Sequence, residues 1–229
     1  MADVLAIIPA RVGSKGIAQK NFRPLAGTSP LDSPLSRAVR CATVVATHVV
    51  ISTDSRELWH TRDGIQVLFA EWPLHSDDCP MIDIVQDVLA RVDGPEDQIV
   101  LLAQPSQPLR QARHLMAAVA LLEATHADSV VSVVQLPATH HPQWQARILG
   151  GRLEQQWTAS ATRRQDLPPV YIRDGTTYCF RRSTVTRFGN MYGQDVRPLL
   201  VPAEETCPLD TVADWAEAER RLCEAKQLA

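Results

Sequence analysis

The residues best suited to chemistry form a short basic loop close to the N-terminus. An apolar run at residues 4–8, which has the pattern of a buried strand, leads directly into this loop. The polar and small residues of the loop are Arg11, Gly13, Ser14, Lys15, Gly16, Lys20 and Asn21. Glycines let backbone N–H groups approach a phosphate closely, and cations offset the charge that develops when an α-phosphate is attacked. The loop therefore favours a triphosphate site, although a solvated turn can also be basic.

Three cations of this loop suit phosphate oxygens. Arg11 and Lys15 lie within the glycine-containing stretch, and Lys20 can reach back from its far side. The loop lacks both the Gly-Lys-Ser/Thr of the Walker pattern and the G-x-G-x-x-G of dinucleotide-binding folds. A hydride-transfer cofactor would also have no use for three phosphate-directed cations. These features argue against a P-loop ATPase and against a Rossmann dehydrogenase.

The chain as a whole is slightly acidic. Its 229 residues carry a formal net charge of −3, which argues against nonspecific nucleic-acid binding. The first 23 residues hold four cations and one acid, which favours a small anionic ligand. The five cysteines lack zinc-site spacing, and no apolar run approaches the roughly 18 residues of a membrane span. We therefore expect a cytoplasmic protein with reduced thiols that binds neither nucleic acid nor membranes.

Short apolar runs alternate with helical patterns along most of the chain. Runs rich in Val, Ile and Leu predict strands at residues 4–8, 48–52, 65–69, 99–103 and 129–134, with helices near 34–46, 81–92 and 112–124. This alternation predicts an α/β fold, a mostly parallel sheet flanked by helices, with ligands at the carboxyl ends of the strands. A last helix is predicted at 212–225, with Thr211 as its N-cap and Asp214 in a capping-box-like position.

Residues 137–180 differ from the rest of the chain, because they are rich in Pro, Gln, Arg and Thr and have weak periodicity. We interpret them as a small lobe of short strands and loops, a candidate dimerisation arm, inserted into a single domain of residues 1–229. His140 and His141 are adjacent within this lobe, so their side chains would point apart in a strand. We therefore favour packing or loop contacts for this pair over a shared metal site.

Six ordered motifs resemble those of the acylneuraminate cytidylyltransferase (CMP-sialic acid synthetase) family. The basic loop is similar to the family's I-P-A-R-x-G-S-K-G-x-x-x-K-N. The other five family motifs are V-S-T-D, Q-P-T-S-P-L-R, S-V-V-S-V with H-H-P, Q-x-L-P with N-G-x-x-Y, and I-D-I-D-T. The corresponding segments here are V-I-S-T-D at 50–54, Q-P-S-Q-P-L-R at 104–110, S-V-V-S-V at 129–133 with H-H-P at 140–142, Q-D-L-P-P at 165–169 with Gly175 and Tyr178, and L-D-T at 209–211. The resemblance covers nearly the whole chain.

The resemblance implies a Rossmann-like nucleotidyltransferase fold and a cytidylyltransferase reaction. In this reaction, an oxygen of a small acidic acceptor such as a sialic-acid-like sugar attacks the α-phosphate of CTP, and pyrophosphate leaves. The resemblance also implies Mg²⁺ as cofactor, and a homodimer whose smaller lobe reaches toward the neighbouring subunit's site.

The matching motifs also imply roles for individual residues. The nucleotide would contact Arg11, Gly13, Ser14, Lys15, Lys20 and Asn21, and Arg11, Lys15 and Lys20 would be the catalytic residues among them. Cys79 and Met81 would also contact the nucleotide, at positions of the cytosine pocket where the family has small or hydroxyl residues. The acceptor would contact Gln104, Arg164, Arg173 and Tyr178. Asp210 would bind Mg²⁺, although an acid at this position could instead complement the dipole of the last helix.

Departures from the family pattern affect the expected metal site and base pocket. Pro208 stands where the first carboxylate of I-D-I-D-T is expected. Either Asp210 suffices for the metal, or Glu204 or Glu205 assists it, or metal use differs. The family's Arg-Pro pair near the base pocket is also missing, because residues 69–72 read F-A-E-W.

Further departures lie on the acceptor side. Asp174 replaces an amide, Arg173 is displaced by one position, and Gln107 replaces a smaller residue. A phosphonate such as phosphonoformate is therefore an alternative acceptor, and a nucleotide-binding homologue without catalysis is an alternative function. Asp54 suits a helix N-cap as well as a catalytic role. Arg110 suits an anion contact as well as an ordinary surface or backbone contact.

Overall fold

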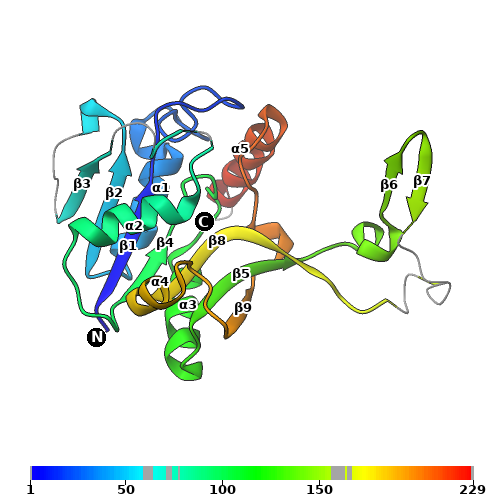
Figure 1. Ribbon diagram of the computed structural model, residues 1–229. Helices are drawn as coiled ribbons and strands as arrows, with labels where there is room; N and C mark the ends of the chain where they lie inside the picture. The colour runs from blue at the N-terminus through cyan, green and yellow to red at the C-terminus, as the bar shows by residue number, and fades with distance from the viewer. Residues whose placement is uncertain are drawn as a thin grey trace.

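The computed structural model describes residues 2–58, 64–70, 74–76, 78–155, 163 and 167–227. Its centre is a seven-stranded sheet of order β3-β2-β1-β4-β8-β5-β9 (Figure 1). The strands are β1 (Val4–Pro9), β2 (His48–Thr53), β3 (Ile65–Phe69), β4 (Ile99–Leu102), β5 (Ser129–Gln135), β8 (Tyr171–Arg181) and β9 (Val196–Leu200). Every strand of this sheet except β8 runs in the same direction. The predicted α/β fold with a mostly parallel sheet is confirmed.

Helices cover both faces of the sheet. The helices are α1 (Pro34–Thr43), α2 (Met81–Arg91), α3 (Ala112–Thr125), α4 (Arg182–Phe188) and α5 (Val212–Gln227). Because successive strand side chains point to opposite faces, Ala6 and Ile8 of β1 pack in the cluster beneath α1 and α3. Leu5 and Ile7 pack in the cluster beneath α2 and α4. The alternating side chains of β1 thus contribute to the core on both faces of the sheet.

Short 3-10 helices connect some of these elements. They are η1 (Pro30–Asp32), η2 (Arg56–Leu58), η3 (Ala138–His140), η4 (Pro142–Trp144) and η6 (Ala203–Glu205). His141 is buried and caps η4, because its Nδ1 accepts a hydrogen bond from the Gln143 amide at 3.1 Å. This is the loop contact that we favoured over a metal site. None of the described helices has the length and apolarity that a membrane crossing requires.

The end of the predicted lobe belongs to the sheet. Strand β8 lies between β4 and β5 and is antiparallel to both, so the part of it within residues 137–180 is not part of a separate lobe. The sequence pattern missed it because β8 starts with exposed residues and then buries Thr176 and Thr177 instead of an apolar run. Helix α4 and the mostly exposed strand β9 were not predicted either.

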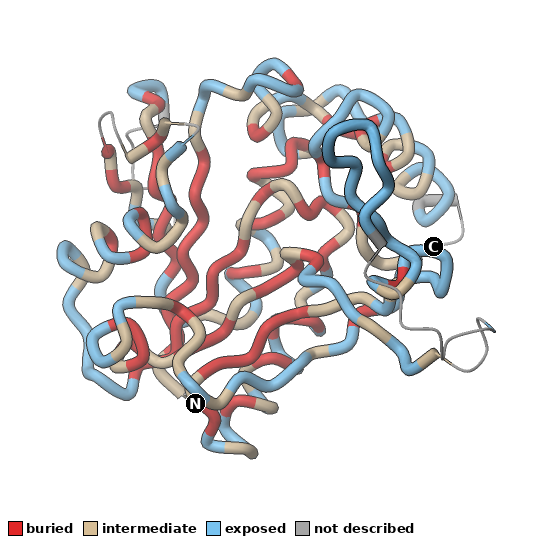
Figure 2. The backbone as a smooth tube through the Cα atoms, turned by 45° about the vertical axis from the view of Figure 1, so that its right-hand side comes forward, coloured by how far each residue is buried: buried red, intermediate tan, exposed pale blue. Residues whose placement is uncertain are grey.

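A two-stranded hairpin stands away from the sheet (Figure 1). It consists of β6 (Ala146–Leu149) and β7 (Arg152–Gln155). The described part of this hairpin is exposed along its length (Figure 2). Its apolar side chains include Ile148 and Leu153, which are 75% and 56% exposed and pair directly across the two strands.

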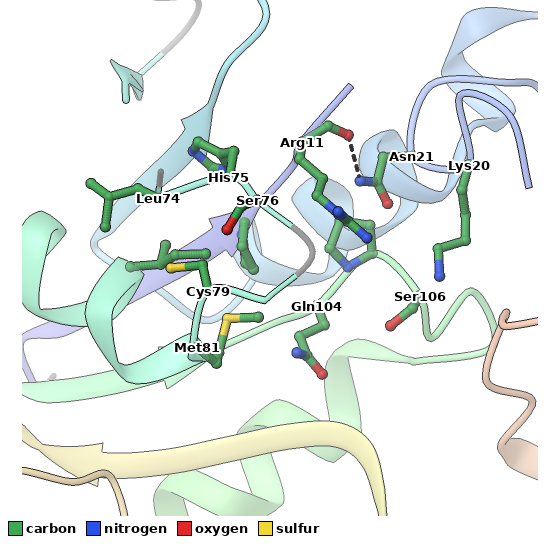
Figure 3. Close-up of a pocket in the computed structure, with 13 residues that line it drawn as sticks. Arg11, Lys20, Asn21, Leu74, His75, Ser76, Cys79, Met81, Gln104 and Ser106 are labelled. Atoms are coloured by element: carbon green, nitrogen blue, oxygen red, sulfur yellow. Dashed lines mark hydrogen bonds between the residues drawn. The ribbon is translucent and has the colours of Figure 1, made fainter. Parts of the chain in front are cut away.

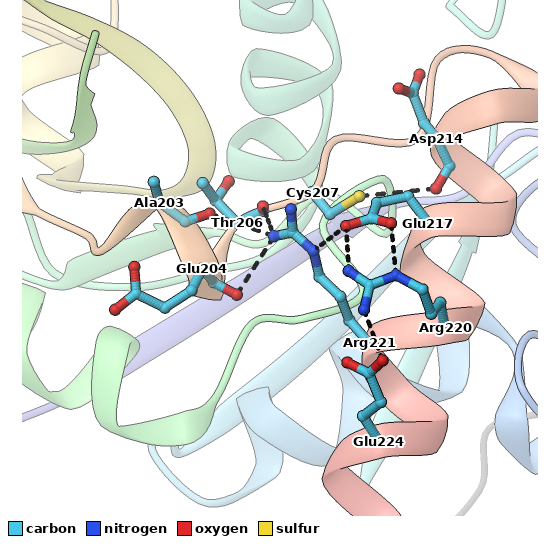
Figure 4. A network of polar contacts seen from close by, with 9 residues as sticks. All are labelled: Ala203, Glu204, Thr206, Cys207, Asp214, Glu217, Arg220, Arg221 and Glu224. Carbon is cyan, nitrogen blue, oxygen red and sulfur yellow. Dashed lines mark hydrogen bonds and ion pairs between the residues drawn. The ribbon is translucent and has the colours of Figure 1, made fainter. Parts of the chain in front are cut away.

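Helix α5 begins with the predicted capping box. The Asp214 carboxylate accepts a hydrogen bond from the Thr211 amide at 2.7 Å, and the Asp214 amide donates to Thr211 Oγ1 at 3.2 Å. Further along α5, Arg221 donates to Glu217 and to the carbonyls of Ala203, Glu204 and Thr206 (Figure 4). The helix therefore holds both the segment around η6 and the segment that leads into its own first turn.

Candidate active site

A cavity of about 220 Å³ opens at the carboxyl ends of the parallel strands. Its lining comes from loops that follow β1 and β4, from the segment before α2, and from the start of α2 (Figure 3). The lining residues are Pro9, Arg11, Lys20, Asn21, Leu74, His75, Ser76, Cys79, Met81, Ile84, Gln104, Pro105 and Ser106. Strand β1 has β2 on one side and β4 on the other, so the cavity lies at the topological switch point where α/β sheets bind ligands.

The basic loop is tied down at its start by two hydrogen bonds. Asn21 Nδ2 donates to the Arg11 carbonyl at 2.9 Å, and the Val12 amide donates to Asp54 Oδ1 at 2.7 Å. Asp54 follows β2 directly, so its carboxylate joins the loop after β1 to the end of the neighbouring strand. Asp54 therefore positions the loop through its backbone.

Lys20 links the basic loop to the segment before α5. Its Nζ donates to the Leu209 carbonyl at 2.5 Å and lies 3.6 Å from Asp210 Oδ1. The side chain of Lys20 is 17% exposed, whereas that of Asp210 is 75% exposed. Gly16 packs closely on the same segment, since a Cβ at this position would lie 2.5 Å from the Asp210 carbonyl oxygen. A lysine and an open carboxylate are thus held together beside the cavity.

An apolar cluster holds the basic loop against α5. Ile17 and Leu25 from the loop region pack with Leu209, Trp215 and Ala218. The guanidinium of Arg23 also lies 4.9 Å from the ring centroid of Trp215. Sequence analysis missed this support, because a tryptophan on the last helix gave no sign of which distant segment it would cover.

One wall of the cavity is apolar and includes Cys79 and Met81, the two residues that the sequence assigns to the base pocket. Leu74 and Ile84 complete this wall. Burial and the neighbouring carboxylate of Asp83 raise the pKa of the Cys79 thiol. Cys79 is therefore a neutral packing residue rather than a nucleophile at neutral pH.

His75 also lines the cavity, although sequence analysis did not select it. The residue is buried, and its Nε2 lies 3.3 Å from Ser52 Oγ at the end of β2. Burial lowers the pKa of His75 from its ordinary value of 6.5, with a smaller lowering from Arg11, while Asp54 and Asp87 oppose the shift. A lone histidine outside any motif could have been found only by knowing that its segment folds over the end of β2.

The predicted acceptor residues divide between two places. Gln104 lines the cavity, but Arg173 and Tyr178 do not. Arg173 donates to the Tyr192 hydroxyl and lies over the ring of Tyr192 at 5.5 Å. Tyr178 packs edge-on against the same ring, with the centroids 6.3 Å apart, and burial raises its pKa. Arg164 lies outside the described residues.

Of the predicted nucleotide contacts, Arg11, Lys20, Asn21, Cys79 and Met81 all line the cavity. Gly13, Ser14 and Lys15 lie in the basic loop next to it but not in its lining.

Among the alternatives for the metal, Glu205 is engaged elsewhere. Its Oε2 lies 2.6 Å from Arg113 Nη2 and 2.7 Å from His114 Nε2. No group of three or more His, Cys, Asp or Glu residues suited to a metal occurs in the described part of the chain.

Comparison with known proteins identifies relatives over most of the chain. A family model described as cytidylyltransferase matches residues 5–204. The N-acylneuraminate cytidylyltransferase of Streptococcus agalactiae serotype III is 28% identical over 92% of this chain and 51% of that protein. The CMP-N,N'-diacetyllegionaminic acid synthase of Legionella pneumophila is 29% identical over 96% of both chains. The chain thus spans about half the length of the N-acylneuraminate cytidylyltransferases that it matches and nearly the full length of the legionaminic acid enzyme.

Solved structures support the fold. A CMP:2-keto-3-deoxy-manno-octonic acid synthetase complexed with CTP has a TM-score of 0.70 at 16% identity, covering 99% of this chain and 100% of that chain. The 2-C-methyl-D-erythritol 4-phosphate cytidylyltransferase of Francisella tularensis has a TM-score of 0.65 at 12% identity, covering 96% and 100%. At these identities the similarity establishes the shared architecture and not a shared substrate.

The lowered pKa of His75 predicts a pH dependence of stability. Between pH 6.5 and the lower pKa of the folded state, the unfolded chain binds a proton that the folded chain resists. The free energy of unfolding should therefore decrease as the pH falls through this window. NMR titration should place the His75 pKa below 6.5, and urea unfolding of His75→Gln should depend less on pH. His48→Gln, which changes a 65% exposed side chain, is the control. A His75 resonance that titrates at or above 6.5 would contradict the prediction.

Proposed function

The chain belongs to the cytidylyltransferase family, and we propose that it transfers CMP from CTP to a sugar-acid acceptor with release of pyrophosphate. The observation that carries this proposal is the cavity at the strand ends, where Arg11, Lys20 and Gln104 face a common space (Figure 3). Relatives named for N-acylneuraminate and legionaminic acid support an acidic nine-carbon sugar as the class of acceptor.

The two walls of the cavity fit the two parts of a nucleotide. The apolar wall around Cys79 and Met81 can pack a planar base, and Arg11 and Lys20 lie where phosphates would extend from it. In the reaction, the acceptor hydroxyl releases its proton to solvent and its oxygen forms a bond to the α-phosphorus. The bond from the α-phosphorus to the bridging oxygen breaks, and its electron pair leaves with pyrophosphate. Arg11 and Lys20 stabilise the negative charge that spreads over the phosphate oxygens. Gln104 orients the acceptor through hydrogen bonds.

We propose Mg²⁺ as the cofactor, with Asp210 as its protein ligand. Asp210 fits this role because it is an exposed oxygen donor beside the cavity, next to Lys20. One carboxylate is sufficient, because Mg²⁺ usually completes its octahedral shell with phosphate oxygens and water. When bound, the ion would neutralise charge on the triphosphate. Pro208 then removes a second carboxylate ligand without removing the site.

We also propose that two copies of this chain form a dimer through the hairpin of β6 and β7. Ile148 and Leu153 form a directly opposed pair of apolar side chains that is outside the core clusters of the described residues. Trp144, at the base of the hairpin, is 40% exposed. An apolar surface on a projecting arm indicates a protein interface, and a second copy of the same chain is the commonest partner in a soluble oligomer.

The reaction is tested by Mg²⁺-dependent pyrophosphate release from CTP with a panel of sialic, ulosonic and phosphonic acids. We expect turnover with a sugar acid and a fall of about 10²–10³-fold in kcat for Lys20→Ala, because the ammonium group stabilises charge in the transition state.

The matched control is Arg220→Ala, which removes an equal charge from an exposed ion pair on α5 (Figure 4). Product formation at the wild-type rate by Lys20→Ala would remove the role of this residue. Release with a phosphonate alone would change the acceptor class, and CTP binding without release for any acceptor would contradict the proposed reaction.

The metal role of Asp210 predicts a changed Mg²⁺ requirement. Asp210→Asn should raise the Mg²⁺ concentration for half-maximal rate by about tenfold or more, because a charged ligand is replaced by a neutral one. Calorimetric titration of Mg²⁺ into the CTP complex should show that Asp210→Asn weakens Mg²⁺ binding by a similar factor. Asp195→Asn, at an exposed ion pair with Arg197, is the control. An unchanged Mg²⁺ titration would assign Asp210 only to the dipole of α5.

The hairpin interface predicts that its apolar pair controls the oligomeric state. Sedimentation velocity should show a dimer for the wild type and a monomer for the double variant Ile148→Asp with Leu153→Asp, because charged side chains would have to be buried at the interface. Leu31→Asp alters a similarly exposed side chain, 69% exposed, away from the hairpin and should leave the dimer intact. A wild type that sediments as a single chain would exclude the dimer.

A further inference from the structure

Arg110 is a buried arginine that lies behind the cavity without lining it. The residue is 4% exposed and belongs to the segment between β4 and α3. Its Nε donates to the Thr176 carbonyl at 2.5 Å, and its Nη2 donates to the carbonyls of Gln104 at 2.6 Å and Gly175 at 3.4 Å. Arg110 therefore makes backbone contacts and does not present its charge to an exposed anion. One planar guanidinium joins the end of β4 to the middle of β8.

The part of β8 that Arg110 contacts departs from regular pairing. The register between β5 and β8 shifts between Val131 and Val133, and Gly175 has a φ of +78°. Residues 174–176 therefore form an arch out of the strand. The arch is held from a second side by Gln107, whose Nε2 donates to the Asp174 carbonyl and whose Oε1 accepts from Thr206 Oγ1 at 3.3 Å. Such a conformation persists only where the surroundings fix it.

The arch supports the side chain of Gln104. A Cβ added to Gly175 would lie 3.3 Å from Gln104 Oε1, so the amide of Gln104 packs over the open face of this glycine. Gln104 lines the cavity together with Arg11 and Lys20 (Figure 3). Arg110 thus holds the backbone of Gln104 and also the arch beneath its side chain.

We propose that Arg110 is a positioning residue that fixes Gln104 and the arch of residues 174–176 as the acceptor-side wall of the cavity. This inference rests on the proposed function for the identity of the acceptor side. Arg110 acts on the substrate only through Gln104, and the nucleotide side of the cavity does not depend on its contacts. Loss of its geometry therefore changes acceptor binding and leaves CTP binding intact.

A second buried arginine provides a matched control. Arg182 is 8% exposed and donates to the carbonyls of Leu89 and Val92, both at 2.9 Å, and to Gln98 Oε1 at 2.8 Å. It follows the last residue of β8, which pairs with Ile99 at the start of β4, and so lies at the opposite end of the strands from the cavity. The two arginines share burial and backbone contacts and differ in their distance from the site.

The experiment compares Arg110→Lys with Arg182→Lys. Lysine keeps the charge but cannot reproduce the planar fork. We expect Arg110→Lys to raise the acceptor KM by roughly tenfold to a hundredfold with the CTP KM nearly unchanged, because small misplacements of an orienting group have effects of this size. Arg182→Lys should lower the Tm about as much as Arg110→Lys does, but it should leave the acceptor KM unchanged. An unchanged acceptor KM in Arg110→Lys, or equal effects on both substrates, would overturn the proposal.

A second pair of variants tests the arch without touching a buried charge. Gly175→Ala places a methyl group against Gln104 at a φ of +78°. Gly189→Ala places a methyl group in open space at a φ of +65°. The strain of the backbone is therefore common to both, and only the first displaces Gln104. We expect Gly175→Ala alone to raise the acceptor KM. Equal kinetics for the two glycine variants would count against the proposal.

Hydrogen exchange separates this inference from the proposed reaction. Amides of residues 171–178 should exchange faster in Arg110→Lys than in Arg182→Lys. A wild type that forms no product with any acceptor overturns the proposed function, and the exchange data then decide whether Arg110 holds the arch. Equal protection of residues 171–178 in both arginine variants would overturn the positioning role.

Discussion

The contact between Lys20 and the backbone at Leu209 is the interaction on which the arrangement of the site depends. It joins residues that are 189 positions apart in the chain. The cations of a flexible basic loop would repel one another and the loop would sample many conformations, because the first 23 residues of the chain hold four cations and one acid. A carbonyl oxygen and the nearby carboxylate of Asp210 give the Lys20 ammonium a fixed position. The apolar cluster around Trp215 includes Leu209, so it shields from water the backbone that accepts the hydrogen bond of Lys20.

The same contact explains why α5 is part of the site although it lies outside the sheet. Its capping box fixes Thr211 and Asp214, and the Asp214 carboxylate also accepts from the amide of Asp210 at 3.1 Å. Because that carboxylate is used in capping, the side chain of Asp210 stays open to solvent beside the cavity. The geometry of a helix N-terminus thus decides which of two nearby acids is available to a ligand.

More of the predicted nucleotide contacts than of the predicted acceptor contacts line the cavity, for a physical reason. Arg11, Lys20 and Asn21 follow one buried strand, so local pattern and motif together are sufficient to place them at the carboxyl end of the sheet. Arg173 and Tyr178 lie on β8, whose polar start and irregular register hide a central strand from any periodicity rule. Their placement beside Tyr192 depends on tertiary packing. His75 was missed for the same reason, since only the fold brings it to Ser52.

The two sides of the cavity therefore have different origins and different tolerance to change. The nucleotide side is built by parallel strands that are neighbours in a continuous core, where the path of β1 leaves little freedom for the loop after it. The acceptor side is built where β8 returns antiparallel between β4 and β5, and its shape depends on a few polar contacts to backbone carbonyls. Gln107 and Asp174, which both depart from the family motifs, take part in these contacts. On the proposed function, the arch of residues 174–176 is therefore the part of the site where the acceptor contacts would change while the loop after β1 stays the same.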